Sequence, residues 1–134
     1  MDIRYNSDIE AMTKDALQEL FLSVKWESGN YPDELLQSIR GSHSIVAAWD
    51  GDKLVGLINA LSDGILTVYF HYMLVDPGYQ GEGIGMNMMK MMLDRYSGCK
   101  TKVLISYGSA IDFYRKCGFS MEDGATPMFI SELV

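Results

Sequence analysis

The sequence predicts a mixed α/β fold in which a mostly antiparallel sheet is flanked by helices. Two apolar runs surround Asp50-Gly51-Asp52, a spacing that is typical of a β-hairpin. A third apolar run at 65–75 leads through a glycine-rich turn into a helical pattern at 84–96. A β-branched run at 101–106 comes next, and a helical crossover would make it parallel to the strand before it.

The first forty residues predict a short edge strand followed by two helices. Residues 2–5 alternate polar and apolar side chains, which indicates the strand. Ser7-Asp8 can cap a helix that runs to about Lys25, with apolar residues at helical spacing. After a loop at 26–31, Pro32 suits the first position of a helix over 32–40. We expect this loop and second helix to form a wall of the substrate site.

The middle of the chain predicts three consecutive antiparallel strands. The hairpin strands span residues 43–49 and 53–61, and Ser62-Asp63-Gly64 marks a second turn before the strand at 65–75. This third strand is unusually long and carries Tyr69-Phe70-His71-Tyr72 at its centre.

The last third of the chain begins with a helix whose apolar residues cover more than one stripe, which predicts burial on most sides. We interpret its methionines as core packing, because no His or Cys converges on them. Gly118 is expected to be the C-cap of the helix before it. The predicted short elements are a strand at 101–106, a helix at 109–117, and strands at 119–121 and 126–133.

The composition predicts one globular domain over residues 1–134, with 48% hydrophobic and 22% charged residues. The formal net charge of −7 argues against a nucleic-acid partner and fits a cationic substrate, although it serves solubility equally well. No run reaches the roughly 18 apolar residues of a membrane span. Residues 1–5 contain no apolar signal core, so we expect no membrane partner and a cytoplasmic location.

The cysteines and histidines do not predict a metal site. Cys99 and Cys117 are too few for a disulfide framework, and His43 and His71 are isolated from them. We expect both cysteines to be reduced and packed, and no metal to be bound.

The stretch Val75-Asp76-Pro77-Gly78-Tyr79-Gln80-Gly81-Glu82-Gly83-Ile84-Gly85 joins a predicted strand to a predicted helix. A helix start presents unpaired N–H groups and the positive end of the macrodipole, and glycines let the backbone approach an anion closely. We therefore expect a phosphate or pyrophosphate ligand. Glycines at 81, 83 and 85 do not give the G-x-G-x-x-G of a dinucleotide-dependent oxidoreductase, and Met86-Asn87 excludes a P-loop.

Two motifs carry a resemblance to a known family. Gln80-x-x-Gly83-x-Gly85 after a strand ending in Val-x-Pro resembles the acetyl-CoA pyrophosphate loop of the GNAT N-acetyltransferases. The family's second signature, A-x-x-F-Y-x-K-x-G-F, is matched by Ala110, Phe113, Tyr114, Lys116, Gly118 and Phe119. The resemblance covers about residues 43–121, and the first forty residues match only in element order. It implies a single GNAT-type domain whose sheet is splayed at the strand ending near Val75.

The resemblance also implies how acetyl-CoA, the co-substrate, would be held. Met73 would lie near the thioester, and the free backbone of Leu74 and Val75 would bond the pantetheine arm. Tyr107 stands where the family often has an Asn that bonds the cofactor, so either its phenol substitutes or that contact is absent. The pyrophosphate would be cradled by the helix start, with Glu82 turned to solvent; these positions are Gln80, Gly81, Glu82, Gly83, Ile84, Gly85 and Met86.

Tyr114 is the predicted catalytic acid, with packing as the alternative. A phenol with a pKa of about 10 is neutral at pH 7 and can donate to the departing CoA thiolate. The base that deprotonates the amine is less defined. His71 has a suitable intrinsic pKa, while Asp63, Asp33, Glu34 and a water chain are alternatives.

The predicted function is transfer of acetyl from acetyl-CoA to a primary amine by direct attack in a ternary complex, since neither cysteine occupies a nucleophile position. The acceptor is expected to be a small cationic amine. A protein N-terminus or lysine is the alternative within the enzyme class, and a non-catalytic acyl-CoA-binding regulatory module is the alternative outside it. A homodimer formed through 126–133 or the N-terminal region is an expectation from the family.

Overall fold

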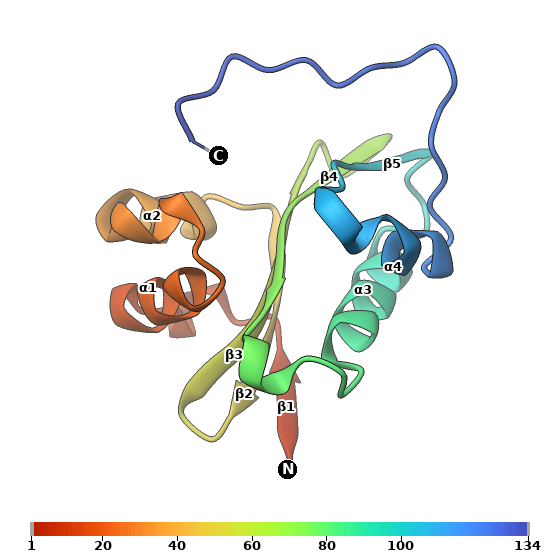
Figure 1. Ribbon diagram of the computed structural model, residues 1–134. Coiled ribbons are helices and arrows are strands. Elements are labelled where there is room, and N and C mark those ends of the chain that lie inside the picture. The colour runs from red at the N-terminus through yellow and green to blue at the C-terminus, as the bar shows by residue number, and fades with distance from the viewer. Residues whose placement is uncertain (1, 134) are drawn as a thin grey trace.

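The computed structural model describes residues 2–133 and confirms a mixed sheet with helices on both faces (Figure 1). The sheet has five strands in the order β1-β2-β3-β4-β5. Adjacent strands are antiparallel from β1 to β4, and β5 pairs with β4 in parallel. The strands are β1 (Ile3–Asn6), β2 (Ser44–Asp50), β3 (Lys53–Ser62), β4 (Thr67–Val75) and β5 (Thr101–Leu104).

The helices α1 (Lys14–Ser23) and α2 (Pro32–Arg40) cover one face of the sheet (Figure 1). The bounds predicted for α2 are confirmed, but the long helix predicted from Ser7-Asp8 is wrong. Asp8 caps only a 3-10 turn, and α1 begins after Thr13, whose hydroxyl accepts from the Ala16 N–H at 3.2 Å. The helix is interrupted at Met12, whose backbone is extended between the 3-10 turn and α1 and whose side chain is fully buried.

The helices α3 (Ile84–Arg95) and α4 (Ile111–Lys116) lie on the other face (Figure 1). Met88, Met89 and Met92 of α3 are fully buried against the sheet, which confirms the interpretation of these three as core residues. Met91 is 40% exposed, so the prediction that the helix is buried on most sides is wrong: one face of α3 packs on the sheet and the other meets solvent. Within residues 2–133, no helix is both long and apolar enough to pass through a lipid bilayer.

Strands β4 and β5 separate halfway along β4, and this opening positions the site. Their pairing ends at Phe70 and Leu104, although β4 continues to Val75. Opposite the opening, β4 carries one extra residue relative to β3, because Ile58 pairs with Met73 whereas Ala60 pairs with Phe70. The predicted splay of the sheet is therefore confirmed.

The strands predicted at 119–121 and 126–133 are wrong, because no strand follows β5 in the described part of the chain. Residues 119–133 instead form an irregular arm that crosses above α4 and the sheet towards α2 (Figure 1). Met128 is 90% exposed. An apolar segment forms a strand only when contacts with a neighbouring strand offset the entropy that ordering costs. Among the described residues, this segment has no neighbouring strand. The homodimer through this segment stays a prediction.

The turn between β3 and β4 generates a prediction about acid stability. The Asp63 carboxylate accepts from the N–H groups of Ile65, Leu66 and Thr67 at 2.8, 2.9 and 3.2 Å, and these bonds lower its pKa. The stability that it contributes should be present above the unfolded pKa of about 4 and lost as the pH falls through the lower folded value. Asp63→Ala should therefore be less stable than wild type at neutral pH, and the two should converge in acid.

Urea unfolding between pH 2 and 7 measures this difference. Asp63→Asn, which keeps an acceptor oxygen without the charge, should retain part of the stability and lose its dependence on pH. A constant gap between wild type and Asp63→Ala down to pH 2 would contradict the assignment.

Candidate active site

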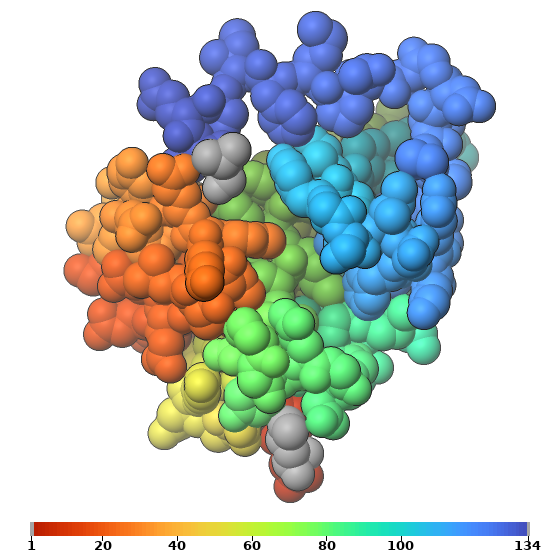
Figure 2. Space-filling model, in the orientation of Figure 1, coloured from red at the N-terminus to blue at the C-terminus, as the bar shows by residue number. Residues whose placement is uncertain are grey.

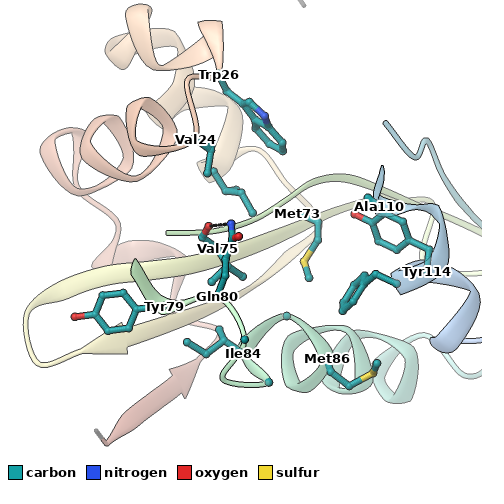
Figure 3. A pocket seen from close by; sticks show the side chains of 15 residues that line it. Val24, Trp26, Met73, Val75, Tyr79, Gln80, Ile84, Met86, Ala110 and Tyr114 are labelled. Carbon is teal, nitrogen blue, oxygen red and sulfur yellow. Dashed lines mark hydrogen bonds between the residues drawn. The ribbon is translucent and has the colours of Figure 1, made fainter. Parts of the chain in front are cut away.

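A cleft of about 610 Å³ opens where β4 and β5 separate. Figure 2 shows the surface hollowed between the N-terminal helices and α4, and Figure 3 shows the side chains that line it. Of the residues predicted from the sequence, those that line the cleft are Met73, Leu74, Val75, Gln80, Gly81, Gly83, Ile84, Gly85, Met86 and Tyr114.

One wall of the cleft is the end of β4. Its backbone from Met73 to Val75 pairs with β3 on one side and has no β5 partner on the other. The Gln80 side chain folds back and donates to the Val75 carbonyl at 3.1 Å (Figure 3). Because buried backbone groups require partners, this free edge suits a ligand that hydrogen-bonds as a strand does.

The glycine loop ends at the exposed start of α3. Gly83, the N-cap, provides no side-chain cap, and no acidic residue occupies the first helical turn. The first-turn N–H groups and the positive helix end thus face outwards without a competing anion. Gly81 and Gly83 have φ of +86° and +81°, values that favour glycine. At Gly85 a Cβ would lie 3.0 Å from the Met73 methyl, so glycine keeps this approach open.

Tyr114 lies on α4 and faces the cleft from the side opposite Trp26 (Figure 3). A Schellman motif fixes the end of this helix: Gly118, at φ +102°, donates to Arg115, and Phe119 donates to the Tyr114 carbonyl at 3.1 Å. The C-cap is Cys117, and Gly118 is the left-handed residue directly after it, so the C-cap predicted at Gly118 is displaced by one residue. Burial, with a smaller contribution from Cys117, raises the pKa of Tyr114 to about 12.

His71 lies beside the cleft and is not part of its lining. Its ring stacks between Tyr69 and Tyr72, with centroid separations of 5.5 and 4.0 Å. Burial lowers the pKa of His71, so the imidazole is neutral at pH 7 and can accept a proton.

The other candidate bases do not line the cleft either. Asp63 is bound to the backbone of its own turn. Asp33 forms an exposed ion pair with Lys14 at 3.2 Å. Glu34 lines a separate cavity of about 230 Å³, together with Ser28 and residues of the arm.

Two predicted cofactor residues do not line the cleft. Glu82 is exposed in the loop, as expected for a carboxylate turned away from an anion. Tyr107 is 69% exposed beyond the end of β5. Burial, followed by the nearby Tyr107 and Tyr72, raises the pKa of Tyr69.

Several lining residues were not named as site residues by the sequence analysis, namely Val24, Tyr79, Ala110 and Phe113. Ala110 and Phe113 belong to the second motif, so the signal for them was available. Trp26 follows α1 and packs against Phe21 and Tyr72, with centroids 5.9 and 6.0 Å apart. Trp26 belongs to the loop at 26–31 that was expected from the sequence to form a wall of the substrate site, whereas no residue of α2, the other part of that expected wall, lines the cleft.

The described residues contain no group of three or more His, Cys, Asp or Glu side chains that could hold a metal ion.

Comparison with known proteins identifies the fold and the family. The family model for the acetyltransferase (GNAT) domain matches residues 40–121. A GNAT family acetyltransferase from Streptococcus pneumoniae TIGR4 is 28% identical with a TM-score of 0.83, covering 98% of this chain and 99% of that one. Glucosamine-6-phosphate N-acetyltransferase from Arabidopsis thaliana shares the fold at 16% identity, with a TM-score of 0.74 and coverage of 98% and 100%.

Among curated proteins, histone acetyltransferase TAP1 from Glycine max is 34% identical over 99 residues, which are 70% of this chain and 42% of that protein. The chain thus spans less than half the length of the curated relatives that it matches. The matched segment contains both the glycine loop and the Tyr114 helix. The chain therefore belongs to the GNAT acetyltransferase family.

Proposed function

We propose that this chain transfers acetyl from acetyl-CoA to a primary amine by direct attack within a ternary complex. The carrying observation is the cleft, which joins an uncapped helix start, a free strand edge and a buried tyrosine. These are the groups that bind a pyrophosphate, a pantetheine amide chain and a leaving thiolate, respectively.

The residues present fit acetyl-CoA as co-substrate. First-turn N–H groups of α3 would hold the pyrophosphate, which explains how a protein of net charge −7 binds a polyanion. The edge of β4 at Leu74 and Val75, which has no β5 partner, would bond the pantetheine arm, with Met73 beside the thioester. The Tyr107 contact, outside the cleft lining, is the weakest of the predicted set.

In the reaction, the amine first loses a proton and then attacks the thioester carbonyl carbon. The C–N bond forms as the C–S bond breaks, and CoA leaves as a thiolate. With a pKa of about 12, Tyr114 stays protonated at neutral pH and donates a hydrogen bond to the sulfur. Complete proton transfer from Tyr114 to a thiolate of ordinary pKa, about 8.5, would be uphill, so the thiolate takes its final proton from the nitrogen of the new amide, which carries one proton too many after the attack.

The acceptor would approach from the α1–α2 side, where His71 and the loop wall lie. A neutral His71 can take the ammonium proton directly or through water. A small cationic amine fits the acidic chain. A lysine of a protein is the second candidate, because a relative carries the name histone acetyltransferase.

The deciding experiment measures release of free CoA thiol with acetyl-CoA and a panel of polyamines, arylalkylamines, aminoglycosides, amino acids and histone-tail peptides. Calorimetry measures acetyl-CoA binding alongside. We expect binding together with acceptor-dependent release. Binding without release for every acceptor would favour the regulatory module, and absence of binding would refute the assignment of the cleft.

Charge at the start of α3 should decide acetyl-CoA affinity. Gly85→Glu places a carboxylate beside Met73 in the cleft and should raise the dissociation constant at least ~100-fold through like-charge repulsion. Gly98→Glu is the matched control, because it adds the same charge near the opposite end of α3 where a side chain meets open space. Equal affinities of the two variants would contradict anion binding at this helix start.

Tyr114→Phe should lower kcat by about 100-fold while acetyl-CoA affinity changes less than about twofold. Because the raised pKa keeps the phenol protonated, the ratio of wild-type to variant rates should stay constant from about pH 6 to 10. Steady-state kinetics across this range, with calorimetry, provides the measurement. An unchanged kcat would reduce Tyr114 to a packing residue.

A further inference from the structure

Asn59 is a polar side chain at the centre of the sheet, and the proposed chemistry does not use it. It lies on β3 with no exposed surface. A buried carboxamide costs stability unless its hydrogen-bonding groups are satisfied, so its partners indicate why the position is polar.

The Asn59 carboxamide connects three segments of the fold. Its Oδ1 accepts from the backbone N–H of Tyr72 on β4 at 2.7 Å. Its Nδ2 donates to the Ser42 hydroxyl at 3.0 Å, and Ser42 donates to the Ser38 carbonyl of α2 at 3.2 Å. The side chain thereby replaces a strand-to-strand bond and ties β4 to the end of α2.

The replaced bond lies at the bulge in β4. Between the pairs Ile58 with Met73 and Ala60 with Phe70, β3 has only Asn59, whereas β4 has His71 and Tyr72. A bulge leaves backbone groups without ladder partners, and the carboxamide satisfies the Tyr72 N–H. Asn59 is therefore the side chain that accommodates the extra residue.

The extra residue changes which face each later side chain occupies. Phe70 packs in the cluster below α3, and strict alternation would send Tyr72 and Leu74 to that same side. Instead Tyr72 and Leu74 pack with α1 and α2, while Met73 joins the α3 cluster. The bulge thus turns Met73 towards Gly85, with its methyl 3.0 Å from the position a Cβ would take.

Tyr72 is held at both ends as a result. Its N–H binds Asn59, and its hydroxyl lies 2.9 Å from the Ser28 hydroxyl in the loop wall. The ring of His71 stacks on Tyr72 at 4.0 Å. A shift of the bulge would therefore move the cleft wall and the predicted base together.

We propose that Asn59 is a positioning residue, whose carboxamide holds the β4 bulge in the register that turns Met73 into the cofactor cleft. The inference rests on the proposed function only for its effect on catalysis. The register itself is a property of the sheet and can be tested without any substrate.

The test compares two variants. Asn59→Leu removes the acceptor for the Tyr72 N–H, whereas Ser42→Ala removes the hydroxyl that accepts from Asn59 Nδ2 and leaves the acceptor for Tyr72 in place. Both variants lose a buried hydrogen bond and should melt at lower temperature. Only Asn59→Leu should lose the nuclear Overhauser contact between the Met73 methyl and Gly85. It should also raise the acetyl-CoA dissociation constant at least ~10-fold, since misplacement by about 1 Å is costly, whereas Ser42→Ala should stay within about twofold.

Two results would overturn the proposal: retention of the Met73–Gly85 contact and of wild-type affinity in folded Asn59→Leu, or equal loss in both variants. If Asn59→Leu does not fold, amide exchange of the wild type decides. The Tyr72 N–H should then exchange as slowly as the ladder amides of β3, and rapid exchange would refute the bond. Failure of the proposed function shows separately, as wild type that keeps the contact but neither binds acetyl-CoA nor releases CoA.

Discussion

The separation of β4 from β5 is the constraint on which the rest of the structure depends. Beyond Phe70 and Leu104 the two parallel strands stop pairing, so the end of β4 loses one set of ladder partners. Unpaired backbone is costly unless water or a ligand satisfies it. The start of α3 lies at the end of this same strand and also has unsatisfied N–H groups. One opening therefore brings together an unpaired strand edge and a helix start with unsatisfied N–H groups.

The two faces of the sheet contribute different groups to this opening. The α3–α4 face supplies the glycine loop, Met73 and Tyr114. The α1–α2 face supplies an aromatic row, in which Phe21 meets Tyr72 edge-on at 4.9 Å and His71 stacks behind it. A buried phenol and a neutral imidazole thus stand on opposite sides of β4, which separates a proton donor from a proton acceptor.

Local patterns predicted most of the fold. The hairpin at Asp50-Gly51-Asp52 and the start of α2 at Pro32 are encoded by residues next to one another, so the sequence was sufficient. The start of α1 was mistaken because two competent caps, Asp8 and Thr13, lie five residues apart, and burial of Met12 decides between them. The final strands failed because pairing depends on a neighbour that the segment itself does not specify.

The site divides in the same way. The glycine loop and the Tyr114 helix are contiguous motifs, so their place at one cleft could be expected from sequence. The loop that contains Trp26 could be expected at the site, but the contact of Trp26 with Tyr72 and that of Asn59 with Ser42 could not, because both arise across the fold. A single polar residue in an apolar strand adds no periodic pattern to the sequence. The strand register that it holds nevertheless decides which side chains of β4 face the cleft.

The methionines of residues 2–133 differ in their exposure to oxidants in solution. Met88, Met89 and Met92 are sealed between α3 and the sheet, whereas Met121 and Met128 stand 67% and 90% exposed on the arm. Oxidants in solution would convert the arm methionines to sulfoxides first, at a place where added polarity disturbs no packing. Sulfoxide at the three helix positions would instead put a polar group into the core beneath the cleft. Peptide mapping after peroxide treatment would thus distinguish oxidation of the exposed arm methionines from oxidation of the buried α3 methionines, which requires the core to open.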